Sequence, residues 1–199
     1  MRGIRRVLAG ALALGLATTL AACANDPLAE QYRSGDNKGF IAADGFEVVE
    51  IPAEERGEPV VFEGTTESGD EVSSADYEGD VLVVNFWYAA CGPCRAEAAD
   101  LEKAYSAFEG EDVAFLGINT ADAPEAAAAF AETYGVSYPS VMAAEDGAVK
   151  LAFAERTPIN ATPTTLVLDS EGRVAARIIG QLEDDSVLKT LVRDALEES

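Results

Sequence analysis

The stretch VLVVNFWYAACGPCR, residues 81–95, decides the fold of this chain. Its first part, Val81–Phe86, is apolar and β-branched except for Asn85, which predicts a strand buried on both faces. Cys91 and Cys94 follow in a CGPC tetrapeptide, and a helix with one apolar stripe begins there. The sequence therefore predicts a buried strand that leads into a helix through a pair of cysteines.

The position of the two cysteines indicates a redox-active pair. Cys91 falls at the helix N-terminus, where the macrodipole and the free backbone N–H groups favour a thiolate. Pro93 suits the first helical turn, because its missing N–H costs nothing there. Cys94 lies one turn into the helix, where it can close a disulfide with Cys91 and reopen it. We therefore expect Cys91 to attack and Cys94 to resolve.

Two other interpretations of a CxxC pair were weighed, a zinc site and a structural disulfide. Zinc needs two further Cys or His ligands, but the chain has no histidine and its third cysteine, Cys23, is distant in sequence. A structural disulfide would need neither Gly92 and Pro93 between its cysteines nor a strand-to-helix junction beneath them. We therefore expect no metal and no bound cofactor, only the redox-active Cys91–Cys94 disulfide.

The segment FWYAACGPCRAE, residues 86–97, resembles the active-site segment of the TlpA/ResA-like thioredoxin family of extracytoplasmic thiol–disulfide oxidoreductases. The similarity runs from Phe62 to Leu196 and includes a TPT segment, Thr162–Thr164, that matches the family's cis-proline loop. Ala90 departs from the tryptophan that commonly precedes the first cysteine. Ala99 departs from the proline that usually kinks the helix.

The resemblance assigns further residues to the site. It implies a cis bond between Thr162 and Pro163 that faces Cys91 and leaves the Thr162 backbone free to pair with an extended substrate. Taken alone, the residues would favour a trans bond, because only about 5–6% of X-Pro bonds are cis. Asn85 stands where cytoplasmic thioredoxins carry a buried aspartate. Trp87 either lines the rim of the site or simply packs in the core.

Glu97 matches the CxxC(K/R)xE pattern of the same family. Cys94 must lose its proton before it attacks, and Asn85 cannot accept that proton as an aspartate would. Glu97 or a bound water is the expected substitute. A solvated carboxylate on the helix face is the alternative for Glu97.

Residues 1–22 predict a lipoprotein signal peptide. Three arginines near the N-terminus precede an apolar stretch, Val7–Ala22, that is shorter than the roughly 20 residues of a membrane-spanning helix. The stretch ends in LAAC, which resembles a bacterial lipobox and implies cleavage before Cys23 and a lipid on its sulfur. An ordinary signal peptide and an uncleaved anchor remain alternatives, as do general and twin-arginine export.

The rest of the chain predicts one domain on a tether. Residues 23–46, the lipidated cysteine and a stretch rich in Asn, Asp, Gly and Ser, predict a flexible tether. Residues 47–199 then predict a single thioredoxin-like domain, since a chain of 199 residues has room for one well-buried core. The net charge of −22 excludes nucleic acid as an expected partner, because phosphate binding needs clustered Lys and Arg.

The remaining patterns predict an α/β fold with a mixed central β-sheet flanked by helices. Short apolar runs predict an N-terminal β-hairpin at Val48–Ile51 and Val60–Phe62, and a second buried strand at Val113–Ile118. A central α/β insertion follows, and a hairpin and a last helix end the domain. The insertion is expected to consist of Pro124–Tyr134, Tyr138–Met142 and Gly147–Ala154, and the last hairpin of Thr164–Asp169 and Arg173–Ile179. Three acidic residues are expected to cap helices: Asp122 and Glu125 as a capping box, and Asp184 before the last helix.

The resemblance implies a lipid-anchored enzyme on the extracytoplasmic face of a bacterial cell membrane. It would reduce protein disulfides, with apocytochrome c as a possible substrate and a CcdA/DsbD-type membrane protein as electron donor. A disulfide oxidase or isomerase for secreted proteins is the alternative within the same chemistry, although Gly-Pro between the cysteines favours the reducing side. A copper-handling Sco-like lipoprotein lacks its histidine ligand here, and a peroxidase would need a threonine pattern that CGPC lacks.

Overall fold

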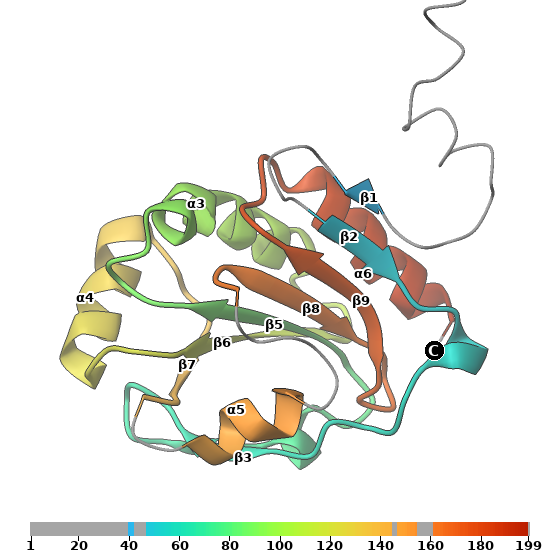
Figure 1. Ribbon diagram of the computed structural model, residues 1–199, viewed down its shortest axis with the longest axis horizontal. Coiled ribbons are helices and arrows are strands. Elements are labelled where there is room, and N and C mark those ends of the chain that lie inside the picture. The colour runs from blue at the N-terminus through green and yellow to red at the C-terminus, as the bar shows by residue number, and fades with distance from the viewer. Residues whose placement is uncertain (1–39, 42–46, 145–146, 155–160, 199) are drawn as a thin grey trace, which may run out of the picture. The chain divides into compact units, whose positions relative to one another are not determined.

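The computed structural model describes residues 40–41, 47–144, 147–154 and 161–198. All of them belong to one compact unit, Lys38–Ser199 (Figure 1). The predictions for the signal peptide, for Cys23 and for most of the tether lie outside the described residues.

A mixed sheet forms the centre of the described unit. Its seven strands are ordered β1-β2-β9-β8-β5-β6-β7. The interior strand β5 is buried at every position; it pairs in parallel with β6 and antiparallel with β8. The strands are β1 (Phe40–Ile41), β2 (Glu47–Glu50), β5 (Val81–Trp87), β6 (Val113–Asn119), β7 (Ser140–Met142), β8 (Thr164–Leu168) and β9 (Val174–Ile179).

Helices cover both faces of this sheet, as Figure 1 shows. Because side chains of a strand alternate between faces, Val81 and Val83 join the apolar cluster under α3 and α6, whereas Leu82 and Val84 join the cluster under α5. A two-stranded sheet, β3-β4, lies beside β7. These elements are α3 (Gly92–Ala107), α4 (Pro124–Tyr134), α5 (Gly147–Ala154), α6 (Ser186–Glu197), the 3₁₀ helices η1 (Ala53–Glu55) and η2 (Ser74–Tyr77), β3 (Glu63–Thr65) and β4 (Glu71–Ser73).

The N-terminal hairpin is present, but only one of its two strands was predicted correctly: β2 contains residues 48–50 of the expected Val48–Ile51 strand, and its hairpin partner is β1. β2 pairs with β1 and with β9, so the sheet already begins inside the range expected to be tether. Val60–Phe62 is not a strand. Val60 and Phe62 are buried and Val61 is 74% exposed, which is the alternation of a strand. The backbone nevertheless lacks a partner strand: the Val60 N–H bonds to the Gly172 carbonyl in the β8–β9 turn.

The capping box expected at α4 is also wrong. The N-cap residue is Ala123, which makes no side-chain cap bond, because the Asp122 carboxylate bonds elsewhere. Gly135 ends the helix in the left-handed conformation. At α6 the Asp184 carboxylate accepts the Ser186 N–H at 2.8 Å as expected, although the formal N-cap is the next residue.

Candidate active site

The carboxyl end of β5 leads through a short loop into α3, and the two cysteines lie at this junction. Cys91 is the N-cap of α3, and its sulfur accepts the Cys94 N–H at 3.1 Å. Cys91 and Cys94 form a disulfide with 5.3 Å between their Cα atoms. Pro93 lies in the first turn of the helix. The Cys91 sulfur therefore receives a backbone donor at the positive end of the helix dipole, which is an arrangement that stabilises a thiolate.

Glu97 lies one turn beyond Cys94 and is fully buried. Its carboxyl group accepts hydrogen bonds from Asn85 Nδ2 at 3.0 Å and from the Leu182 N–H at 2.9 Å. Burial raises the pKa of Glu97 to about 7, although the two hydrogen bonds oppose this rise. The solvated helix-face alternative for Glu97 is therefore wrong. The Glu97 carboxyl group can change its protonation state near neutral pH.

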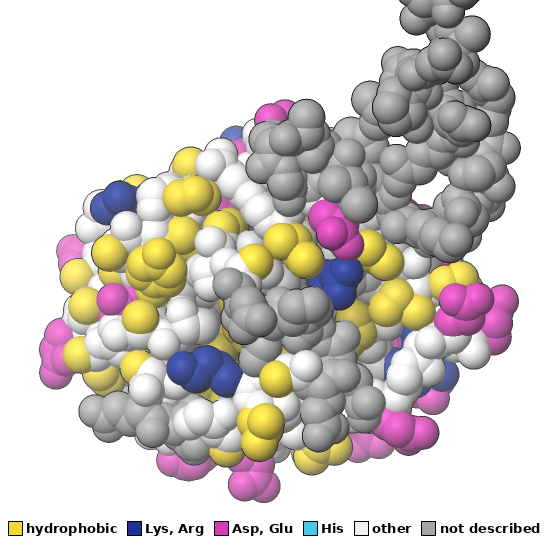
Figure 2. All heavy atoms as spheres, viewed as in Figure 1, with side chains coloured by type: hydrophobic (Ala, Val, Ile, Leu, Met, Phe, Trp, Pro, Cys, Tyr) yellow, Lys and Arg dark blue, Asp and Glu magenta, His cyan; other side chains and the backbone are white. Residues whose placement is uncertain are grey.

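Trp87 is buried beside the disulfide. Its side chain is 5% exposed and packs in one apolar cluster with both cysteines and with Phe130, whose ring centroid is 4.3 Å away. Trp87 Nε1 donates to Ser140 Oγ at 3.1 Å. Trp87 therefore packs in the core and does not line the rim of the site. Hydrophobic side chains also gather on the surface between α3 and α4 (Figure 2).

Gly117 on β6 makes room for this Trp87–Ser140 contact. A Cβ atom at Gly117 would lie 2.2 Å from Ser140 Oγ and 2.8 Å from Trp87 Nε1, closer than such atoms approach. Neither Gly117 nor Ser140 was predicted from the sequence as a supporting residue. A lone glycine in a strand can mark a close approach, but it does not say of what.

Asp122 supports the loop before the cysteines. Its carboxylate accepts the Ala89 N–H at 2.6 Å and Asn119 Nδ2 at 2.8 Å. The Thr120 N–H adds a bond to the Trp87 carbonyl at 2.9 Å. One sequence signal could have indicated this role: neighbouring parallel strands end at the same edge of a sheet, so the residues after β5 and β6 had to meet.

The TPT segment reaches the same edge from β8. Thr164 is the register partner of Phe86, so Thr162 and Pro163 precede β8 beside the carboxyl end of β5. The Thr162–Pro163 peptide bond is cis, as the resemblance implied. The Pro163 carbonyl accepts the Gly180 N–H at 3.0 Å, which fixes the segment to the end of β9.

The described part of the chain contains neither a metal-site cluster nor a membrane-spanning helix. No three of its Cys, Asp or Glu side chains gather as a metal site would require. None of its helices has both the length and the apolar character needed to span a bilayer.

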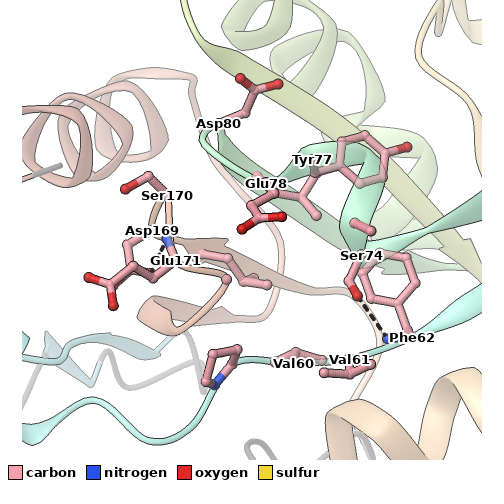
Figure 3. Close-up of a pocket in the computed structure, with 15 residues that line it drawn as sticks. Val60, Val61, Phe62, Ser74, Tyr77, Glu78, Asp80, Asp169, Ser170 and Glu171 are labelled. Atoms are coloured by element: carbon pink, nitrogen blue, oxygen red, sulfur yellow. Dashed lines mark hydrogen bonds between the residues drawn. The ribbon is translucent and has the colours of Figure 1, made fainter.

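A hollow of about 460 Å³ lies at the amino end of β5, opposite the end that carries the cysteines (Figure 3). Val60, Phe62 and Tyr77 contribute to its apolar lining, and the Glu78 and Asp80 carboxylates lie along it. It is formed by segments 59–62, 74–80 and 168–172, which include the turn between β8 and β9. Neither cysteine lines it, so it is separate from the redox pair.

Asp169, in the wall of that hollow, is the centre of an ion-pair cluster. It is 3% exposed, and its Oδ2 lies 3.1 Å from Arg56 Nη1 and 3.0 Å from Arg173 Nε. Its Oδ1 accepts the backbone N–H groups of Glu171 and Arg173. Arg56 also pairs with Glu198 near the C-terminus. The cluster therefore ties the β8–β9 turn to both ends of the described domain.

Comparison with known proteins identifies the class to which this site belongs. The sheet order, the helices and the disulfide at the start of α3 define a thioredoxin-like fold. The chain belongs to the AhpC/TSA family, whose sequence profile matches residues 57–177.

Among curated relatives, the thiol-disulfide oxidoreductase ResA of Geobacillus kaustophilus is 26% identical over 123 residues, which cover 62% of this chain and 68% of ResA. The thiol:disulfide interchange protein HelX of Rhodobacter capsulatus is 29% identical over 114 residues, 57% of this chain and 60% of HelX. Among solved structures, a DsbF homologue from Corynebacterium diphtheriae is 28% identical with a TM-score of 0.64, and the match covers 78% of this chain and 98% of that protein.

A secreted thiol-disulfide isomerase from Corynebacterium glutamicum has a TM-score of 0.67 at 23% identity, with 80% of this chain and 97% of that protein covered, and so supports the fold alone. Together with the Cys91–Cys94 pair, these similarities show an enzyme of the thiol–disulfide oxidoreductase class with a thioredoxin-like fold.

Proposed function

We propose that the protein reduces disulfides in protein substrates, with Cys91 as attacking thiol and Cys94 as resolving thiol. The Cys91 thiolate attacks a substrate disulfide and forms a mixed disulfide, and Cys94 then attacks the Cys91 sulfur. Two electrons pass to the substrate, which leaves as a dithiol, and the enzyme is left with the Cys91–Cys94 disulfide. A separate reductant must restore the dithiol. The observation that carries the assignment of Cys91 as the attacking thiol is the Cys94 N–H donated to the Cys91 sulfur at the helix N-terminus.

The direction of electron flow follows from the charges near the pair. Any group that stabilises the Cys91 thiolate makes the pair more oxidising. The chain has no histidine to place a positive charge beside Cys91. Among the described residues, the only charged side chain that is buried near the pair is the acid Glu97. We therefore expect a reduction potential closer to that of thioredoxin, about −270 mV, than to that of DsbA, about −120 mV.

Equilibration in glutathione buffers poised between those two values tests the direction. The fraction of dithiol is measured by alkylation and mass spectrometry. A reductase of this potential is found mainly as the disulfide. A population that is mainly dithiol would instead support the alternative, an oxidase or isomerase.

We further propose that Cys23 carries a lipid that anchors the enzyme on the extracytoplasmic face of the membrane. The LAAC tetrad, the short apolar stretch and the basic residues before it support this placement. The enzyme should fractionate with membranes, and Cys23→Ala should release it or leave it unprocessed. An unmodified Cys23 in protein from the native host would contradict the anchor.

The proposed substrates include apocytochrome c, and the proposed electron donor is a CcdA/DsbD-type membrane protein. Both proposals rest on the resemblance of FWYAACGPCRAE and on the similarity to ResA and HelX. Expression of Cys94→Ala in the native host should trap substrates as mixed disulfides with Cys91. Proteomic identification of the trapped proteins tests the substrate class, and a trap without any cytochrome apoprotein contradicts apocytochrome c.

A further inference from the structure

The resolving thiol needs an exit for its proton, and the buried acid next to it does not offer one. Glu97 is fully enclosed, and both of its oxygens already accept hydrogen bonds. A proton taken up by Glu97 would therefore have no direct contact with solvent. Cys94 has a second polar neighbourhood, which also includes Asn85.

A small cavity borders Cys94 there, with about 10 Å³ open to the centre of a water-sized sphere. Apolar side chains from α3 and α4 line part of it, together with a group of polar residues. The polar lining consists of Asn85, Glu67, Ser140, Tyr138 and the indole of Trp87. This is room for one water molecule with the two to four polar partners that a buried water needs.

Asn85 presents an acceptor to this cavity. Both hydrogens of its amide group are committed, one to Glu97 at 3.0 Å and one to Thr165 Oγ1 at 3.0 Å. Only Oδ1 remains for the side of Asn85 that faces the cavity. Asn85 can therefore hold a water beside Cys94 but cannot take its proton.

Glu67 connects the cavity to the surface. It lies in the β3–β4 turn, and its backbone N–H bonds to the Ser140 carbonyl at 3.0 Å. Its side chain reaches back so that Oε2 accepts the Ser140 N–H at 2.8 Å. Glu67 lines the cavity and is also half-buried, so this residue borders both the interior and solvent.

We propose that Glu67 is a proton-relay residue for the resolving step, acting through a single water in the cavity beside Cys94. As Cys94 attacks the Cys91 mixed disulfide, its proton passes to this water, a proton of the water passes to the Glu67 carboxylate, and Glu67 releases it to solvent. The Cys91–Cys94 bond forms, the bond to the substrate sulfur breaks, and the substrate leaves as a thiolate. The inference rests on the proposed thiol–disulfide exchange and adds the route of its proton.

The test separates attack from resolution in the full chain carrying Cys23→Ser, so that only the two active-site thiols react. The reduced protein is mixed with one equivalent of 5,5′-dithiobis(2-nitrobenzoate) in a stopped-flow instrument. Attack by Cys91 releases a first thionitrobenzoate, and resolution by Cys94 releases a second. Glu67→Gln is compared with Glu63→Gln, which removes the same charge from an exposed position on the same hairpin.

At about pH 6 we expect Glu67→Gln to slow the second release about tenfold, which is less than the roughly 10²–10⁴-fold that a directly positioned acid–base group contributes, because a water intervenes. The first release and the reduction potential should not change, and Glu63→Gln should behave as the parent. Above about pH 9 the difference should disappear, because hydroxide then removes the Cys94 proton directly. If Glu67→Gln does not fold, Glu67→Asp should show a smaller slowing with the same pH dependence.

An unchanged second phase, or an equal slowing at every pH, would overturn the relay. So would a slowed first phase or a shifted potential, since these indicate that Glu67 only supports the packing behind the disulfide. If no first release occurs at all, the proposed function itself fails, and this result is distinct from failure of the relay.

Discussion

Two buried carboxyl groups lie at opposite ends of β5, and their partners differ completely. Glu97, at the carboxyl end, is 0% exposed and is bonded by an amide side chain and a backbone N–H. Asp169, at the amino end, is 3% exposed and is paired with two guanidinium groups. A buried acid without a cation keeps a raised pKa, whereas an acid with cations forms a structural link. Equal burial therefore leaves a titratable group at one end of the strand and a structural ion-pair cluster at the other.

The largest effect is expected from substitution of the two cysteines, which lie at the carboxyl end of β5. Cys91→Ala should abolish disulfide exchange and trap no substrate, because the attacking thiol is lost. Cys94→Ala should still attack and should accumulate mixed disulfides. Non-reducing gels and mass spectrometry after incubation with a disulfide-bonded protein distinguish the two variants. If Cys91→Ala formed the trapped species instead, the order of attack would be reversed.

Asp169→Asn should destabilise the fold at the amino end of β5. It leaves two arginines at a buried site without their shared anion, and we expect a loss of about 3 kcal/mol in the free energy of unfolding. The matched control is Glu171→Gln, which removes the more exposed partner of Arg173 and should cost less than about 1 kcal/mol. Urea titrations give both values. The rate of disulfide exchange by the folded fraction should not change, and a large change would show that the two ends are coupled.

The raised pKa of Glu97 predicts a pH dependence of stability. The folded state binds a proton up to about pH 7, whereas an ordinary glutamic acid loses it near pH 4.5. The folded state therefore holds more protons in this window, and stability should fall as pH rises from about 4.5 to 7, by on the order of 3 kcal/mol. Glu97→Gln should flatten this slope, and Glu132→Gln, on the exposed side of α4, should keep it. Urea midpoints across the window measure the slope, and one that persists in Glu97→Gln would assign it to another group.

The smallest effect is expected from Gly117→Ala. The added methyl group must displace Ser140 or Trp87, and such overpacking typically costs about 1–3 kcal/mol. Because Trp87 packs against both cysteines, the reduction potential should shift as well. Gly135→Ala is a useful control: it is strained by its positive φ but has no neighbour near the disulfide that its methyl group would meet. A loss of stability without a shift in potential would show that the Trp87–Ser140 contact is purely structural.

The sequence predicted the active-site half of the fold well, because its signals are local. A strand buried on both faces and two cysteines at a helix start each depend on a few neighbouring residues. The bounds of α4 and α5 follow from such signals. The cis bond at Pro163 came from the resemblance, since the residues alone favoured trans.

The parts that could not be predicted depend on long-range partners. Val60–Phe62 alternates like a strand, but whether a strand forms depends on a partner that the β8–β9 turn supplies only in part. Asp122 reads as a helix cap until the Ala89 N–H is known to lie nearby. The connection between Glu67 and Ser140 spans 73 residues, so no local pattern could indicate it.

Trp87 is the only tryptophan in the chain, and it packs against the one pair of groups that changes chemically during turnover. A disulfide quenches the emission of an adjacent indole more strongly than two thiols do. The intrinsic ultraviolet fluorescence of the unlabelled enzyme is therefore a direct optical signal of its oxidation state. Each reduction of the Cys91–Cys94 bond should brighten the protein, and each substrate turnover should dim it again.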